Sequence, residues 1–376
     1  MTLEGLHLLL LIGPAVPVPA PAAVVGSLES AEITHAADRS GFQLRFRVGP
    51  RSPLQTTLLP AGYFDPITTR VILVATVGGL PQVLVDGLIT RQEMAPSDVP
   101  GESTLTVTGE DLSLAMDLVE MPFMRFPAQP VIARVYTILA KYAALGVIPV
   151  AVPPIIPDLA NPLEAIASQT GTDRAYLKTL ARAVGYVFYV EPGPAPGASI
   201  AYFGPDARIP LPQPALTLNM GAASNVETLS FSLDGLAKKV VVMTVMDPVT
   251  RRTPIPVPVP NFNILRPPLG ARPTAPAKVE FPSNAAGLSP SAAASYALAL
   301  SFGASDAITG TGTLDVLRYG RVLRSRMMVG VRGAGVAYDG MYYVNSVTHS
   351  LKKGQYKQNF TLSRDGLVSQ TPVVPA

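Results

Sequence analysis

The segment from Tyr338 to Leu367 has the sequence YDGMYYVNSVTHSLKKGQYKQNFTLSRDGL, which predicts two β-strands joined by a short Lys-Gly turn. Bulky and polar residues alternate in the second strand, so one face is expected to carry Tyr356, Gln358, Phe360 and Leu362. A period of two residues is typical of an antiparallel strand with one face in the core. The segment therefore predicts the closing hairpin of a β-rich domain, and it contains no recognisable catalytic motif.

The start of this hairpin adds two local expectations. Asp339-Gly340 suits the positive φ angles of tight turns at little steric cost. Tyr342 and Tyr343 are neighbours on one strand and point to opposite faces of it. One ring is therefore expected in the core, and the other is expected at a surface left for a partner.

A first β region is predicted at residues 27–120. Apolar residues alternate with polar ones from Phe42 to Val48 and from Leu105 to Val107, which indicates half-buried strands. The segment from Val71 to Val77 is almost wholly apolar and suggests a strand covered on both faces. Antiparallel strands with short turns favour a small barrel or sandwich.

The period then changes to 3.6 residues, which marks an inserted α/β module at residues 121–224. Its helices are expected to begin at cap residues and to end at glycines. The expected elements are a helix over Val131–Tyr142, a short helix opened by Asn161-Pro162, a helix capped by Thr172 or Asp173 that stops at Gly185, and a strand over Tyr186–Val190.

A second β region is expected at residues 225–369, followed by a short tail at residues 370–376. A proline-rich excursion at residues 247–289 interrupts it, and the backbone of this excursion is not expected to donate a regular ladder. Such a long connection is either an interface element or a plain loop. Ser289-Pro290 then begins an Ala-rich helix that ends near Gly303.

Residues 1–26 are expected to form an extended, proline-rich arm. Leu8 to Ile12 is a short apolar run like that of a signal peptide, but Glu4 precedes it and no Lys or Arg does. Pro14 and the prolines after it would break a spanning helix. We therefore expect neither export by this segment nor membrane insertion by the chain.

The composition limits the class of protein. The chain has 376 residues, which is enough for two or three domains. Only 15% of the residues are charged, against roughly 25% in ordinary soluble domains, so much of the surface is expected to be buried against other subunits. A proteome rich in Ala and Pro would lower the charge in the same way. The net charge is only +3 and the basic residues are scattered, so nucleic-acid recognition is not expected.

Catalytic, cofactor-binding and metal-binding residues are not predicted anywhere in the chain. There is no cysteine, which excludes disulfides and thiolate metal sites. The three histidines His7, His35 and His349 lack metal-ligand spacing, and each is expected to be an ordinary surface or rim residue. No Ser lies in a GxSxG elbow, which removes the most recognisable hydrolase arrangement.

Two further sets of residues, a glycine-rich segment and four acidic residues, have structural rather than catalytic explanations. The segment VGVRGAG, with Gly330, Gly333 and Gly335, lacks the Lys-Ser/Thr pair of a phosphate loop, so a turn or bulge is expected. A glycosidase needs two carboxylates that flank one bond, and nothing in the sequence brings together Glu110, Asp111, Asp117 and Glu120. Glu110-Asp111 begins a short helix, where acidic residues interact favourably with the helix N-terminus.

Several segments share an order with one known family. The terminal hairpin carries Asp339-Gly340, Tyr342-Tyr343-Val344, Ser346-Val347-Thr348-His349, Gly354, Tyr356, Phe360 and Leu362-Ser363-Arg364-Asp365-Gly366-Leu367. The segments at residues 83–117 and 171–197 and the strand from Phe42 to Val48 extend the pattern over most of the chain. Together they resemble baseplate hub proteins, the family of phage late control protein D and of the VgrG base. The resemblance is closest to hubs of extracellular contractile injection systems.

The resemblance implies an α+β fold, mainly β, with two related β-barrel hub domains and an inserted α/β module. It also implies a non-enzymatic homotrimer that adapts a threefold spike to a sixfold inner tube and transmits the force of contraction. The implied partners are inner tube proteins, a separate spike protein and other baseplate components. The chain would be made in the cytoplasm and assembled into a tail-like particle, either a virion baseplate or an extracellular device.

Two alternative hypotheses assign the chain to other functional classes, an enzyme and a carbohydrate-binding protein. A hub-associated enzyme that opens an envelope would require a hydrolase constellation, which the sequence does not contain. An exported β-rich carbohydrate-binding protein would have a cleaved N-terminus, which a hub would retain.

Overall fold

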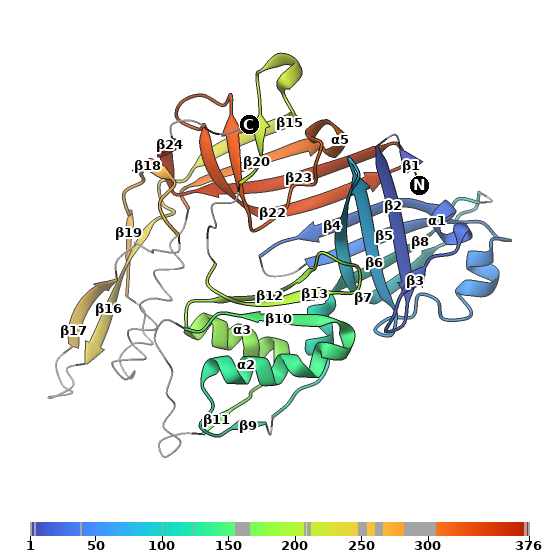
Figure 1. Cartoon of the computed structure of the whole chain (residues 1–376), viewed down its shortest axis with the longest axis horizontal. Coiled ribbons are helices and arrows are strands. Elements are labelled where there is room, and N and C mark those ends of the chain that lie inside the picture. The colour runs from blue at the N-terminus through green and yellow to red at the C-terminus, as the bar shows by residue number, and fades with distance from the viewer. Residues whose placement is uncertain are drawn as a thin grey trace.

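The computed structural model describes residues 2–3, 5–37, 40–99, 101–122, 124–154, 166–206, 208, 212–246, 254–259, 266–281, 306–371 and 374. A large, mostly antiparallel sheet of fourteen strands forms most of the described chain. A smaller α/β module with its own sheet lies against it (Figure 1). The fold is therefore α+β and mainly β, as the sequence predicted.

The N-terminal half of the large sheet contains strands from the first part of the chain. In spatial order these are β1 (Thr2–Leu3), β2 (Leu6–Gly13), β6 (Arg70–Val77), β7 (Leu80–Ala95), β8 (Ser103–Asp111), β5 (Ser40–Val48) and β4 (Leu28–His35), with β3 (Val18–Pro19) beside β2. The predicted alternation is confirmed in β5, where Phe42, Leu44, Phe46 and Val48 are buried. The apolar strand β6 is buried at nearly every position, also as predicted.

The C-terminal half continues the same sheet. Its strands are β22 (Gly340–Lys352), β23 (Gln355–Arg364), β20 (Ile308–Asp315) and β15 (Val226–Leu233), while β21 (Met328–Arg332) pairs with β22 and β14 (Pro212–Thr217) pairs with β21. The two halves meet where β4 pairs with β22, and we call this ladder the seam. One hydrophobic core extends across both halves.

The predicted hairpin of residues 338–367 is confirmed by β22 and β23. Tyr356, Gln358 and Leu362 are completely buried and Phe360 is 3% exposed. No ladder among the described residues joins the two ends of the large sheet. Two closed barrels within one chain therefore stay a prediction.

The inserted module has a separate core. Helices α2 (Val131–Leu139) and α3 (Asp173–Ala183) pack on a sheet of β10 (Val147–Ala151), β13 (Ser199–Gly204) and β12 (Val187–Pro192), with a small pair formed by β9 (Arg125–Phe126) and β11 (Ala167–Ser168). The Thr172 hydroxyl caps α3 by accepting a hydrogen bond from the Ala175 amide at 3.2 Å. In contrast to the expected extent of the module, β14 lies within residues 121–224 but belongs to the large sheet.

Short helices complete the connections of the described chain. They are α1 (Ala22–Ser27), η1 (Leu54–Leu58), η2 (Leu112–Met116), η3 (Ala140–Leu145), η4 (Gly221–Ala223) and α5 (Val316–Tyr319). The helices expected at Asn161-Pro162 and from Ser289 to Gly303 lie outside the described residues. Within the described residues, no helix is both long and apolar enough to cross a membrane.

The N-terminal segment was expected to be an extended arm, and part of it is a strand of the large sheet. Residues 6–13 form β2, a strand that pairs with β6 along its whole length. Leu6, Leu8, Leu10 and Ile12 are buried in the main core, while His7 points to solvent. Alternation in the run from Leu8 to Ile12 is hidden in the sequence, because both strand faces carry apolar residues there.

The proline-rich excursion also differs from expectation, because part of it forms regular ladders. Strand β17 (Pro254–Val259) pairs with β16 (Lys239–Met246), and β19 (Lys278–Glu280) pairs with the other edge of β16. Prolines occupy every second position of β17, so its amide donors all lie on one edge of the strand. A further pair, β18 (Gly270–Pro273) with β24 (Gly366–Ser369), ties the excursion to the chain end.

Candidate functional site

A polar face lies on the C-terminal half of the large sheet. Ladder partners on β15, β20, β23 and β22 place Ser230, Thr311, Thr361 and Ser346 in one row and Thr228, Thr313, Asn359 and Thr348 in the next. These eight residues, here called the hydroxyl face, line an open hollow of about 450 Å³. None of the residues that line this hollow is charged. Such a face can offer many weak hydrogen bonds but holds no charged ligand.

The hydroxyl face continues across the seam. The hydroxyl groups of Thr34 on β4 and Thr348 on β22 are 3.1 Å apart and share a hydrogen bond. Beyond Thr34 the exposed side chains of the N-terminal half include the charged residues Glu32, Arg45 and Arg47. Glu29 contacts Arg47 at 3.1 Å and Arg45 at 3.5 Å. The face is therefore uncharged around the hollow and carries charged side chains beyond Thr34.

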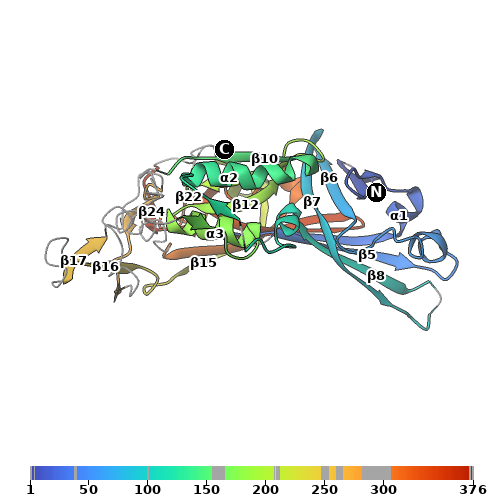
Figure 2. The same cartoon turned by 90° about the horizontal axis from the view of Figure 1, so that it is seen from below.

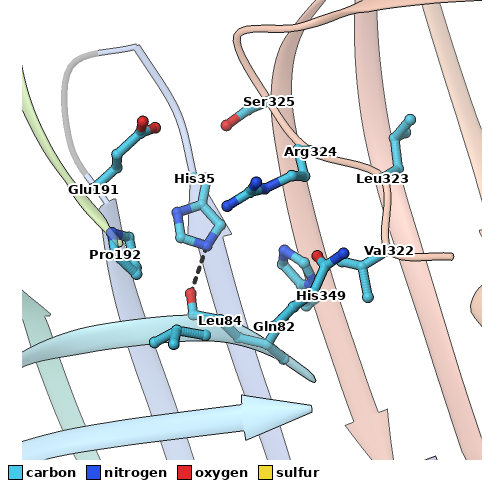
Figure 3. Close-up of a pocket in the computed structure, with 11 residues that line it drawn as sticks. His35, Gln82, Leu84, Glu191, Pro192, Val322, Leu323, Arg324, Ser325 and His349 are labelled. Atoms are coloured by element: carbon cyan, nitrogen blue, oxygen red, sulfur yellow. Dashed lines mark hydrogen bonds between the residues drawn. The ribbon is translucent and has the colours of Figure 1, made fainter. Parts of the chain in front are cut away.

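A small pocket of about 40 Å³ lies at one end of the seam, beside His35 on β4 and His349 on β22 (Figure 3). The two imidazole rings meet edge to face with their centroids 5.4 Å apart. His35 Nε2 lies 2.7 Å from the carbonyl oxygen of Leu84. His349 Nδ1 lies 2.8 Å from the hydroxyl of Tyr356. The pair thus joins strands from both halves of the sheet.

Both histidines are held in the neutral form. Burial lowers the pKa of His35 from 6.5 to about 4, and the nearby Arg326 and Arg324 guanidinium groups act in the same direction. Burial, assisted by His35, also holds the pKa of His349 well below 6.5. The third titratable neighbour is Glu191 on β12, where burial raises the pKa of the carboxyl group. The expected surface position of His349 is wrong, because this residue is only 3% exposed.

Acidification is expected to weaken the folded state through these histidines. Below pH 6.5 these histidines bind protons in the unfolded chain but stay neutral in the folded protein. The free energy of unfolding therefore falls as the pH falls towards 4. For His35, whose pKa is lowered to about 4, the loss between pH 7 and pH 5 should be about 2 kcal/mol. The measurement is the urea midpoint at both pH values for the wild type and for His349→Gln. The variant should lose less stability than the wild type on acidification, and exposed His7→Gln is the control. Equal losses in all three proteins would contradict this assignment.

The inserted module is fixed to the large sheet by a buried ion pair. Arg70 on β6 binds Asp86 on β7 through two hydrogen bonds, of 2.6 Å from Nε and 2.7 Å from Nη2. Both side chains are almost fully buried. Ser199 of the module donates to Asp86 at 3.0 Å, and Arg70 donates to the carbonyl of Gly197 at 3.2 Å. A further bond from Arg70 reaches the carbonyl of Ala15 in the N-terminal segment.

A second set of contacts joins the module side of the chain to the C-terminal half. Arg326 lies over the ring of Tyr189 on β12, with 3.9 Å from its guanidinium carbon to the ring centroid. The Tyr343 hydroxyl donates to Asp206 at 2.6 Å. Tyr343 is 5% exposed and Tyr342 is fully buried. The expectation that one of these tyrosines is left for a partner is therefore wrong, because Asp206 and Arg208 in the connection after the module contact Tyr343.

The Arg364-Asp365-Gly366 part of the terminal motif organises the backbone. The buried Arg364 guanidinium donates to the carbonyls of Ala337, Asp339 and Gly366 and lies over the Tyr342 ring. The Asp365 carboxylate accepts hydrogen bonds from the amides of Leu269 and Gly270. These residues hold the loop before β22 and the strand β18 in place. Their role in the structure is therefore architectural.

The other residues considered for chemistry have local structural roles. Asp111 caps η2 by accepting from the Ser113 amide at 2.8 Å, and burial raises the pKa of its carboxyl group. Arg174 contacts both Glu110 and Asp117, at 3.4 and 3.5 Å. Gly333 and Gly335 have φ angles of 85° and 92° in the loop after β21, as a turn requires. Among the described residues, no cluster of His, Asp and Glu could hold a metal ion.

Sequence reasoning missed the histidine pair and the Arg70–Asp86 pair. His35 and His349 lie in separate segments at opposite ends of the chain, and no local pattern connects them. Arg70 is the first residue of the apolar strand β6, and Asp86 is a single charge inside an apolar stretch of β7. A charge within an otherwise apolar run was the available signal, since such a charge must be paired if it is buried.

Comparisons with solved structures place this fold among tail proteins. A tail protein from Neisseria meningitidis MC58 aligns with a TM-score of 0.63 and 15% identity, over 97% of this chain and 98% of that one. The 43 kDa tail protein of prophage MuSo2 from Shewanella oneidensis aligns with a TM-score of 0.60 and 13% identity, over 96% and 100% of the two chains.

A chain of the Francisella PdpA–VgrG complex aligns over all of this chain and 55% of its own length, with a TM-score of 0.58 and 9% identity. This chain thus spans about half of that longer protein. No family model matches the sequence, and no curated protein matches it. The likeness therefore lies in the fold, which is that of phage tail and VgrG-type proteins.

Proposed function

We propose that this protein is a structural baseplate hub of a contractile phage tail or injection device. The observation that carries the proposal is the construction of the large sheet. Four antiparallel strands, β7, β8, β5 and β4, meet four others, β22, β23, β20 and β15, at the seam. Each chain would contribute two similar blocks, at residues 27–120 and 225–369. A homotrimer would therefore present six comparable contacts to a sixfold tube. A threefold spike would meet three equal subunits.

The hydroxyl face supports a passive role for this surface. It is extended and polar, and the residues that line the hollow include no His, Lys, Asp or Glu that could transfer a proton or activate a hydroxyl for attack. In the proposed trimer this face lines the central channel. An uncharged channel wall would not bind molecules that move through it by charge. The inserted module, fixed by Arg70 and Asp86, then lies on the outer side of the ring, towards other baseplate components.

The test is purification of the tagged protein from its native producer. Tube, spike and sheath proteins should co-purify and be identified by mass spectrometry, and negative-stain images should show tail-like particles. The isolated protein should have a mass by light scattering of three times the chain's 39.5 kDa. A monomer without particle proteins would contradict the proposal.

A further inference from the structure

The sequence contains four Asp-Gly pairs, and the fold places them in different surroundings. The pairs are Asp86-Gly87, Asp234-Gly235, Asp339-Gly340 and Asp365-Gly366. In such a pair the backbone nitrogen of the glycine can attack the carboxyl carbon of the aspartate, because glycine has no Cβ to hinder the approach. The attack forms a five-membered succinimide ring. Its rate depends on how freely the carboxyl group and the amide can move towards each other.

Three of the pairs are held in place by the fold. Asp86 forms the buried ion pair with Arg70. Asp365 accepts hydrogen bonds from two backbone amides at 2.7 and 3.0 Å, and Asp339 accepts one from the Ala334 amide at 2.7 Å. The glycines that follow these aspartates belong to the ladders of β7, β24 and β22. Formation of the ring at these pairs would require a local opening of the sheet.

The Asp234-Gly235 pair is different, because it lies in the turn after β15. Both residues are exposed, as are Leu233 and Leu236 on either side. The Asp234 carboxylate accepts one hydrogen bond, from the Leu236 amide to Oδ1 at 2.8 Å. No described residue accepts a hydrogen bond from the Gly235 amide. A Cβ on Gly235 would have no atom within 4 Å, so the turn has room to change its shape.

We propose that Asp234 is converted spontaneously to isoaspartate in the folded protein. The Gly235 nitrogen forms a bond to Asp234 Cγ and loses its proton, while one carboxyl oxygen leaves as water. Water then opens the succinimide ring at either carbonyl carbon. Opening at the side-chain carbonyl restores aspartate, and opening at the main-chain carbonyl leaves isoaspartate, in which the chain continues through Cγ. One water leaves and one is added, so the reaction requires no enzyme, metal or oxidant.

The product changes the point at which the chain leaves the large sheet. The Asp234 amide donates to the Ala307 carbonyl at 2.8 Å, which extends the β15–β20 ladder by one bond. Figure 2 shows the chain continuing from β15 into β16 and β17, which extend away from the rest of the molecule. Isoaspartate adds one carbon to the backbone at this junction and moves the carboxylate away from the Leu236 amide. The turn that leads into β16 therefore loses its hydrogen bond, whether or not the protein is a hub.

The test compares the four pairs within one protein. The purified full chain is incubated warm at neutral pH for several weeks, and isoaspartate at each pair is then measured by mass spectrometry of its peptides. A second sample is incubated in guanidinium chloride, in which the chain is unfolded. A third sample is Gly235→Ala, which keeps the Asp234 carboxylate but hinders the attack by its Cβ. Because this Cβ has open space around it, the variant should keep the unfolding midpoint of the wild type.

Isoaspartate should accumulate at Asp234 in the folded protein and stay near its starting level at Asp86, Asp339 and Asp365. In guanidinium chloride it should form at all four pairs at comparable rates, because the contacts that protect three of them are lost. Gly235→Ala should reduce formation at Asp234 to the level of the other three. Equal formation at all four pairs in the folded protein, or none at Asp234, would overturn the inference. The same preference for Asp234 in the unfolded chain would assign it to local sequence instead of the fold and would overturn it as well.

Discussion

Replacing Asp86 with alanine is expected to lower the free energy of unfolding by about 3 to 5 kcal/mol, because the substitution leaves the buried Arg70 guanidinium without its counter-ion. The loss is a large share of the ~5 to 15 kcal/mol that stabilises a typical domain. It should also loosen the module, since Ser199 loses its acceptor on Asp86. Urea unfolding measures the first effect, and limited proteolysis of the module measures the second.

Two further variants make the Asp86 result specific. Glu93→Ala breaks an exposed ion pair with Arg91 on the same strand, and it should change stability by no more than about 0.5 kcal/mol. The double variant Arg70→Met with Asp86→Leu removes both charges and should be more stable than Asp86→Ala alone. If Asp86→Ala were as mild as Glu93→Ala, the buried pair would not fix the module to the sheet.

Introducing a charge with Phe360→Asp is expected to prevent folding of the C-terminal half of the sheet. The Phe360 side chain is 3% exposed, and its ring lies directly over the backbone of Gly312 on β20. Loss of the ring alone costs about 3 to 5 kcal/mol, and the buried carboxylate has no partner, which adds several more. The expected result is insoluble protein, or soluble protein without the cooperative unfolding transition of the wild type.

The neighbouring residue provides a matched control for Phe360→Asp. Asn359 is exposed on the opposite face of β23, and its side-chain oxygen accepts a hydrogen bond from Thr313 at 2.8 Å. Asn359→Asp adds the same charge and keeps the acceptor, so it should fold with nearly wild-type stability. Phe360→Leu should fold but with reduced stability. A soluble, cooperatively folded Phe360→Asp protein would contradict the core position of this residue.

The parts of the fold that were predicted from sequence are those with a local signal. The alternation in β23 and β5, the cap at Thr172 and the stop of α3 at Gly185 each depend on residues within a few positions of one another. Strand β2 was missed because its solvent face also carries leucines, which removes the contrast between faces. Strand β17 was missed because prolines were taken to exclude pairing, whereas alternate prolines block only one edge.

The contacts between distant segments could not be predicted, because they depend on which strands meet. The position of His349 illustrates this. Its strand was expected, but its ring is enclosed by Tyr356 and Gln358 on β23 and by His35 on β4. Tyr343 likewise depends on Asp206, which lies in the connection after the module. These residues become buried only when the strands of the sheet come together.

The seam between β4 and β22 has a consequence for how the protein is made. Residues 28–35 are translated about 300 residues before their partner, residues 340–352. At ~5 to 20 residues per second, the first strand waits roughly 15 to 60 s for this partner. During that time β4 presents a bare edge to other nascent chains. Contacts between segments so far apart also fold slowly. We therefore expect that its producer cell needs a chaperone to protect the unfinished chain, and that assembly of the particle begins only after each chain has been released.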